Sequence, residues 1–396
     1  ISTLSTSVDS WIIDGKKVQS TQKPTIVSST LTWEKVTTLD LGLDARFFND
    51  ALGVTFDWYN RTTSDILTTA NLPATLGADA PYENMGTIQT KGWELAIDYR
   101  HTFKNGLHFG VTASVADDKT EVTKWTYNTK IPSYGATGWW DKSAYKEGMV
   151  LGDIWGLQFD RFLTEDDFNA DGSLKAGLPD QTKVFPAGYQ FAPGDVLYKD
   201  LDNNGEIVKQ TNTNDKGDLS VIGNALPRLQ FGLNLDAAWK GFDISMFFQG
   251  VAKRKLWAAG NQVLPGFTTG EPFYKGAEDY WTPENTDAFY PRPMDYKQSA
   301  SGNYSVNDRY LLNMAYLRLK TFTVGYSLPK VWLSKFKVQG LRVYFTGENL
   351  FTIDGVKPAI DPEIGIRTAS GKSDQRNFGR SYPYQKTVSF GIQLSL

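Results

Sequence analysis

The chain has 396 residues, of which 40% are hydrophobic and 14% aromatic, and it contains no cysteine and only two histidines. Its formal net charge is −3 and its basic residues form no long run, so we expect no nucleic-acid partner. The absence of cysteine excludes thiolate metal sites and cysteine nucleophiles. No run approaches the roughly 18 apolar residues of a membrane-spanning helix, whereas strands with alternating polarity remain possible.

Nine segments alternate between apolar and polar residues, which predicts strands with one apolar and one wet face. In the last of them, Val388, Phe390 and Ile392 alternate with Ser389 and Gly391. The nine predicted strands are 31–48, 51–64, 88–103, 106–118, 226–239, 241–253, 314–328, 339–351 and 384–396.

The connections between these strands alternate between short and long. The first three pairs are joined by tight turns, at Asn49-Asp50, at 104–106 and at Lys240-Gly241. Long connections separate the pairs, and a connection of intermediate length lies at 329–339. A soluble sandwich has no reason to sort its loops by end, whereas outer-membrane barrels have short periplasmic turns and long extracellular loops. The long segments that we expect to be extracellular loops are 65–87, 119–225, 254–313 and 352–383.

The predicted fold class is therefore all-β, a transmembrane antiparallel β-barrel. Nine strands cannot close such a barrel, because the first and last would run in the same direction, and unpaired edges are costly in lipid. We expect 31–396 to be the C-terminal part of a larger barrel and 1–30 to be an extracellular loop that leads into it. The last strand should end on the periplasmic side. The side chains expected to face lipid are Phe56, Val111, Leu233, Ile244, Val343 and Phe390, and those expected to face the lumen are Thr112, Asn234, Ser245 and Gln393.

Several short motifs occur in a fixed order from about Leu31 to the C-terminus. They include TKGWEL (90–95), GDVLYKDLDNNG (194–205), FFQG (247–250), YLRLK (316–320), GYSLP (325–329) and ENLF (348–351). In this order and spacing the chain resembles the SusC/RagA family of TonB-dependent outer-membrane transporters of Bacteroidetes. One departure is Leu396, where such barrels often end in an aromatic residue.

The resemblance implies a barrel of about 22 strands, a plug domain in its lumen and a SusD-like surface lipoprotein as partner. It also implies import of oligosaccharides or oligopeptides, energised through TonB, and integral insertion in the lipid of the bacterial outer membrane. No plug or TonB-contacting segment can be recognised in these residues. The alternative function is a surface glycan-binding β protein that transports nothing. We expect no enzyme, because His101 and His108 flank a tight turn and no nucleophile or phosphate-loop motif occurs.

An acidic loop offers a possible calcium site. Asp200, Asp202, Asn204 and Gly205 follow the start of an EF-hand loop, in which alternating oxygens around a glycine turn meet one hard cation. The twelfth position, normally glutamate, is threonine, so a solvated turn is the competing interpretation. The predicted metal ligands are Asp200, Asp202, Asn204, the backbone carbonyl of Glu206 and Asp218. A second loop, 167–172, repeats the spacing and carries the same two interpretations.

Aromatic residues in the long loops are candidates for contact with the solute or with a partner protein. The alternative is that they pack inside the loops and stabilise them. The candidates are Trp139, Trp140, Trp257, Phe273, Tyr274, Tyr280 and Trp281. A different group of tryptophans suits the membrane interface, where amphipathic rings sit at the headgroups. This group is Trp58, Trp93, Trp239 and Trp332.

Overall fold

The architecture was taken from a computed structural model. The residues that the structure describes are 6–21, 28–69, 81–126, 145–209, 216–258, 260–267, 273–294, 302–333, 338–357, 360–363, 368–369, 372–373 and 384–395. Within these ranges no helix has the length and apolar character needed to cross a bilayer.

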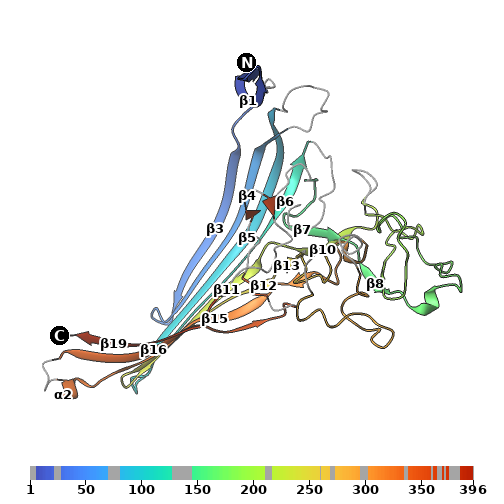
Figure 1. The fold of residues 1–396 in the computed structure, drawn as a ribbon. Coiled ribbons are helices and arrows are strands. Elements are labelled where there is room, and N and C mark those ends of the chain that lie inside the picture. Colours follow the sequence, from blue (N-terminus) through green and yellow to red (C-terminus); the bar gives the residue numbers. More distant parts are fainter. Residues whose placement is uncertain are drawn as a thin grey trace.

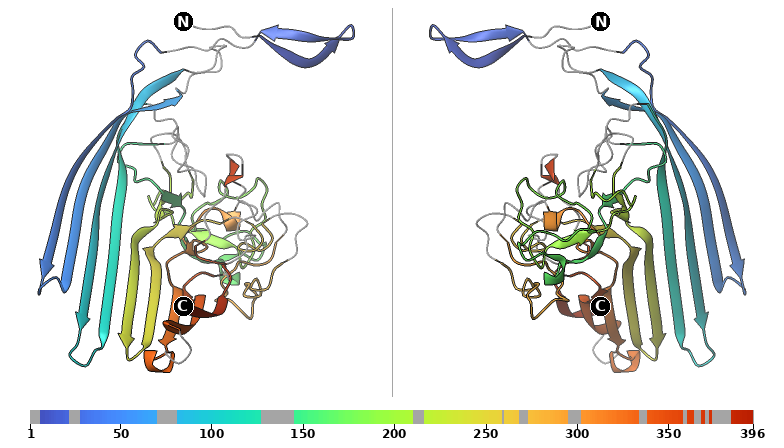
Figure 2. Two further views of the ribbon diagram at one scale, coloured as in Figure 1. Left: turned by 90° about the vertical axis from the view of Figure 1, so that its left-hand side faces the viewer. Right: turned by 90° about the vertical axis from the view of Figure 1, so that its right-hand side faces the viewer.

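A single nine-stranded antiparallel sheet dominates the structure and curves around a body of loops (Figures 1 and 2). Its order follows the sequence from one edge to the other, so each strand pairs with its neighbours along the chain. The strands are β3 (Lys35–Phe47), β4 (Leu52–Thr69), β5 (Tyr82–Thr102), β6 (His108–Trp125), β11 (Arg228–Trp239), β12 (Phe242–Lys253), β15 (Tyr316–Ser327), β16 (Gly340–Asp354) and β19 (Thr387–Ser395). The predicted all-β class and the nine predicted strands are confirmed.

Three of the four short connections are tight turns at the same end of the sheet, at the lower end in Figure 2. The turn after β3 places Phe48, Asn49 and Asp50 at positive φ, and the turn between β11 and β12 does the same with Lys240 and Gly241. Two consecutive residues at positive φ match the right-handed twist of the flanking strands. The fourth connection contains the short helix α2 (Lys330–Leu333).

Strands β4, β5 and β6 extend further toward the other end of the sheet than the alternation predicted. Ile66, Val122 and Trp125 lie in these extensions and are buried with Tyr145 and Met149 in a small core cluster. Burial on the extensions removes the simple alternation there, because both faces meet other residues.

The register places apolar side chains of successive strands on one face of the sheet. Phe56 lies opposite Leu95, which lies opposite Val115, which in turn lies opposite Phe231. Followed through all nine strands, the same register puts the six predicted lipid-facing side chains on this apolar face and the four predicted lumen-facing side chains on the other, polar face. The alternation therefore gives one continuous apolar surface.

The hydrophobic core is formed mainly by residues of the long connections between the strands of the sheet. Two buried clusters fill a body formed by 145–225 and 254–315, which we call the loop body. Each cluster takes residues from both segments: Trp281 and Ala288 join the cluster of the first segment, and Ile154 and Ala225 join the cluster of the second. The two segments thus fold as one packed unit.

Short strand pairs frame the loop body. They are β7 (Asp153–Gly156) with β10 (Ser220–Asn224), β8 (Phe159–Phe162) with β9 (Val196–Tyr198), and β13 (Lys255–Leu256) with β14 (Leu312–Asn313). The single-turn 3-10 helices η4 (Glu165–Asp167) and η5 (Gly302–Tyr304) complete it. Elsewhere, β17 (Thr368–Ala369) pairs with β18 (Lys372–Ser373). Part of 1–30, expected to be a loop, forms a hairpin of β1 (Thr6–Ile13) and β2 (Lys16–Thr21).

Candidate functional site: the lumen wall and the loop body

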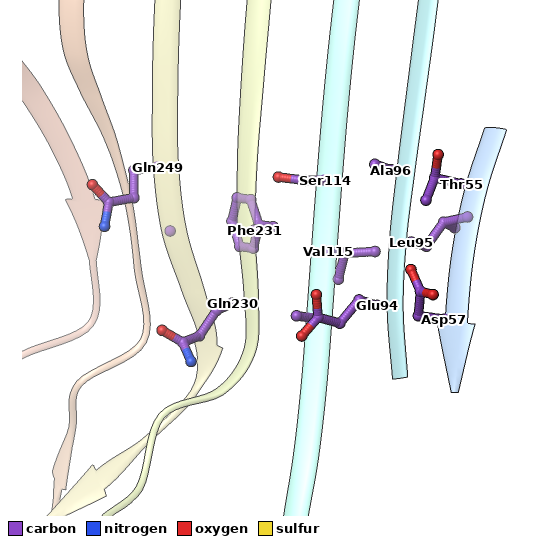
Figure 3. Close-up of a pocket in the computed structure, with 12 residues that line it drawn as sticks. Thr55, Asp57, Glu94, Leu95, Ala96, Ser114, Val115, Gln230, Phe231 and Gln249 are labelled. Carbon is purple, nitrogen blue, oxygen red and sulfur yellow. The ribbon is translucent and has the colours of Figure 1, made fainter. Parts of the chain in front are cut away.

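The polar face of the sheet forms a shallow hollow of about 400 Å³ over strands β4 to β12 (Figure 3). Thr55, Asp57, Glu94 and Gln249 line it from polar positions of the three strands β4, β5 and β12. Asp57 lies directly opposite Glu94, a pairing of like charges that water or a cationic surface would relieve. The wall is suited to a hydrated lumen and carries no arrangement for covalent chemistry.

Residues of the connections cover part of the polar face of the sheet. Val251 and Arg318 belong to polar positions of β12 and β15, yet both are buried. The residues that cover Arg318 come from the connection after β16.

Arg318 is the centre of a buried ionic cluster that the sequence analysis missed. It is 3% exposed and donates to Asp361 at 2.7 Å and to Thr352 at 2.8 Å. Glu363 accepts from Arg318 and also from Lys320 at 3.1 Å. Burial raises the pKa of Asp361, but hydrogen bonds from Arg318 and from two backbone amides outweigh it and lower that pKa. The cluster fixes the base of the connection 355–386 to the sheet.

A charged residue in the middle of an alternating strand was the available signal for this cluster. Arg318 lies in the motif YLRLK, and its acidic partners Asp361 and Glu363 follow it by 43 and 45 residues in the sequence.

A second buried contact joins the two segments of the loop body. Asp195 is fully buried, accepts from Arg292 at 2.8 Å and from Asn303 at 3.0 Å, and also receives the Tyr189 hydroxyl.

The predicted calcium loop brings three carboxylates together. Oxygen atoms of Asp200, Asp202 and Asp218 lie within 4.8 Å of one another. The turn is built as expected, with Gly205 at positive φ and its amide donating to Asp200 at 2.8 Å. Asn204 lies in the same turn and accepts from the Glu206 amide at 2.7 Å.

Hydrogen bonds within the loop already use part of this oxygen set. Both carboxylate oxygens of Asp218 accept backbone amides, and the side chain of Glu206 pairs with Lys183, which leaves its carbonyl as the predicted ligand. Asp200 Oδ1 is buried without a hydrogen-bond partner among the described residues. Desolvation and the neighbouring carboxylates raise the pKa of Asp202. A bound cation would coordinate the unpaired Oδ1 of Asp200 and would reduce the repulsion between the neighbouring carboxylates.

The second acidic loop has a different arrangement. Asp167 forms a bidentate pair with Arg161, at 2.6 and 2.7 Å, and this hydrogen-bonded pair lowers the pKa of Asp167 to about 2. Asp171 accepts the amide of Ser173 at 3.0 Å, the geometry of an Asx-turn. Since its carboxylates are engaged by protein donors, this loop fits the interpretation as a hydrogen-bonded turn.

The candidate aromatic residues divide into buried and exposed groups. Trp257 and Trp281 lie in the two core clusters, where they stabilise the loop body and are out of reach of a ligand in this arrangement. Phe273, Tyr274 and Tyr280 line an open hollow of about 570 Å³. Trp139 and Trp140 lie outside the described residues.

Comparison with known proteins identifies the family. The family model described as "TonB dependent receptor-like, beta-barrel" matches residues 5–350. TonB-dependent receptor P3 of Formosa agariphila is 27% identical over 97% of this chain and 36% of its own length. TonB-dependent receptor SusC of Bacteroides thetaiotaomicron is 24% identical over 96% of this chain and 34% of its own length.

Among solved structures, the RagAB peptide transporter matches with a TM-score of 0.68. The match covers 99% of this chain and 38% of the other, at 21% identity, and supports the fold. The chain thus spans about a third of the length of the relatives it matches. The resemblance to SusC and RagA is confirmed. The chain belongs to the TonB-dependent receptor-like β-barrel family, a family of outer-membrane transporters and not of enzymes.

Proposed function

We propose that the chain is the C-terminal barrel part of an outer-membrane transporter that imports oligosaccharides or oligopeptides. The observation that carries the proposal is the register of the nine-stranded sheet, which gives one apolar face for lipid and one polar face for a lumen. TonB would energise import through a plug domain, which these residues do not include. A surface glycan-binding β protein would have no use for an exposed apolar face of this extent.

The edges of the sheet support membership of a larger barrel. Within the nine-stranded sheet, β3 and β19 each pair on one side only. Unpaired backbone groups at these edges would cost several kcal/mol each in lipid. We infer that further strands pair with both edges, and we propose 31–396 as barrel and 1–30 as an extracellular segment leading into it.

Aromatic residues at the short connections support the placement of this end of the sheet at a membrane interface. Phe48, Phe103, Trp239 and Trp332 are all exposed and lie at or beside these connections. Exposed aromatic rings are typical of both interfaces of an outer-membrane barrel, so they do not by themselves choose the side. Because such barrels have short periplasmic turns and long extracellular loops, we assign this end to the periplasm and the loop body, with the loops 119–225, 254–313 and 352–383, to the outside. Trp58 and Trp93 lie opposite each other on the apolar face, as interface residues would.

A SusD-like lipoprotein is the proposed partner of the outward surface. Long loops rich in aromatic residues and gathered at one end suit a docking surface. Deleting 265–300 from the full-length protein should weaken association with the lipoprotein and solute uptake, while the barrel still inserts. If association and uptake both stayed at the parent level, this segment would have no part in docking.

We also propose that the loop 194–218 binds Ca²⁺ through Asp200, Asp202, Asn204, the carbonyl of Glu206 and Asp218. The proximity of three carboxylates and the unpartnered buried oxygen of Asp200 support it. The cation would act as a structural clamp, because the loop connects β9 with β10 inside the loop body.

The transport proposal is tested with the full-length protein in its own outer membrane. Uptake of radiolabelled oligosaccharide and oligopeptide pools is compared between the parent and a strain without TonB. We expect uptake of one pool to depend on both the transporter and TonB. A protein that stays monodisperse in buffer without detergent, and binds glycan without uptake, would replace the transporter by the surface-binding alternative.

A further inference from the structure

An open hollow in the loop body has walls made mostly of aromatic rings and proline. It measures about 570 Å³, within the range of roughly 300–1,000 Å³ typical of ligand pockets. The rings are those of Phe273, Tyr274, Tyr280, Tyr290 and Tyr304, and three prolines complete the apolar wall.

The hollow has a fixed floor and an exposed rim. Tyr290 and Tyr304 are part of a buried core cluster, and the Tyr290 hydroxyl donates to the carbonyl of Val263 at 2.9 Å. Phe273 is 57% exposed and Tyr280 is 41% exposed. A ligand that covers exposed rings beside a rigid apolar floor is stabilised, because it removes apolar surface from water.

Opposite charges stand at the boundary with a second hollow of about 550 Å³. Lys275, Glu278 and Tyr290 line both hollows, so the two adjoin each other. The second hollow adds Asp279 and Lys357. In the described part of the chain, neither Lys275 nor Glu278 forms a salt bridge, so each is free to pair with a charge on a ligand.

We propose that the two hollows bind one extended oligopeptide, with a proline or aromatic side chain against the rings and charged groups facing Lys275 and Glu278. This inference rests on the proposed transport function and selects the peptide among its two solute classes. Grooves of aromatic and proline residues suit extended proline-rich chains, which lose little entropy on binding. A neutral glycan, in contrast, has no charge to pair with Lys275 and Glu278.

The test uses the full-length protein in detergent and isothermal titration calorimetry. The probes are a pool of proline- and phenylalanine-rich octapeptides with free termini, and neutral maltooctaose. Phe273→Ala and Tyr280→Ala should each weaken peptide binding roughly tenfold. Phe273→Tyr should retain binding. Val221→Ala is the matched control, since Val221 is 48% exposed in the loop body and lines neither hollow.

A second set of variants tests the charges. Lys275→Gln should weaken binding of peptides with a free carboxylate but not of their amides, and Glu278→Gln should weaken binding of peptides with a free ammonium but not of acetylated ones. The inference is overturned if the parent protein does not bind the peptides. It is also overturned if binding is unchanged in all of Phe273→Ala, Tyr280→Ala, Lys275→Gln and Glu278→Gln. Maltooctaose binding that is lost in Phe273→Ala also overturns it and assigns the hollow to glycan.

Uptake measured on the same proteins separates the inference from the function on which it rests. If TonB-dependent uptake persists while the octapeptides do not bind at these residues, the inference fails and the transport function stands. If the parent shows no TonB-dependent uptake of any solute, the transport function itself fails.

Discussion

Removing Arg318 should release the connection 355–386 from the sheet. The variant Arg318→Met keeps the length of the side chain and removes its charge. Asp361 and Glu363 then stay buried, with side chains 4% and 9% exposed. Asp361 would keep only the backbone amides of Glu363 and Tyr384, each at 3.0 Å. Glu363 would keep Lys320 and the hydroxyl of Tyr316.

The expected cost follows from leaving buried charge without its partner. Breaking a buried ion pair from one side typically costs about 3–5 kcal/mol. Here this free energy is lost from the docking of the connection and not from the sheet. The backbone of residue 318 keeps Gln249 and Thr352 as its strand partners whichever side chain it carries. A loss of this size raises the population of the open connection on the order of a thousandfold.

Hydrogen exchange followed by mass spectrometry on the full-length protein in detergent measures this opening. The amides of Asp361, Glu363 and 384–386 should lose protection in Arg318→Met, while those of β12 and β15 keep theirs. The triple variant Arg318→Met, Asp361→Asn, Glu363→Gln removes all three charges and should lose less protection than the single variant. Unchanged protection in the single variant, or greater loss in the triple one, would refute the reasoning.

Three further predictions follow from the sheet and the loops. Leu233→Arg on the apolar face should cost about 2–4 kcal/mol and impair assembly, whereas Asn234→Arg on the polar face should be mild; heat-modifiable gel mobility measures this, and equal effects would contradict the assignment of the faces. Chelation should make the loop 194–218 sensitive to protease, and added Ca²⁺ should restore its resistance. The variant Asp200→Asn should show no such response. If neither treatment changed the protease resistance of the parent loop, the proposed calcium site would be wrong. Because the folded pKa of Asp167 is about 2, below the ordinary 3.8, its stabilising contribution is present above pH 3.8 and is lost as pH falls toward 2. Protease resistance of the loop body between these values should fall less in Asp167→Asn than in the parent, and identical acid profiles would exclude the pair with Arg161 as the cause.

The sheet was predictable because its signals are local. Alternation with a period of two marks a strand that has lipid on one side and water on the other, and Asn49-Asp50 and Lys240-Gly241 supply the positive φ values that tight turns need. The ends of the strands were less predictable. The extensions of β4 and β6 pack Ile66 and Val122 against a connection distant in sequence, and no periodicity encodes that contact.

The candidate site depended on contacts between distant segments. Composition marks Trp257, Trp281, Phe273 and Tyr280 alike as loop aromatics, but only packing separates the two buried tryptophans from the two exposed rings. The acidic loop was recognisable because Asp200, Asp202 and Asn204 lie within a few residues of one another. The partners of Arg318 were not, since they come from a connection whose path no local pattern fixes.

The shared core of the loop body has a consequence for exchanging parts between relatives. A chimaera that replaced only 145–225 would remove Ile154 and Ala225 from beneath one cluster and leave Trp281 with a foreign surface, and it would also separate Arg292 from buried Asp195. The two segments therefore constitute one transplantable unit. An exchange between relatives would have to graft both together, with joins beside Trp125, Arg228, Lys253 and Tyr316. It would also have to keep the packing of Tyr145 and Met149 against Ile66, Val122 and Trp125.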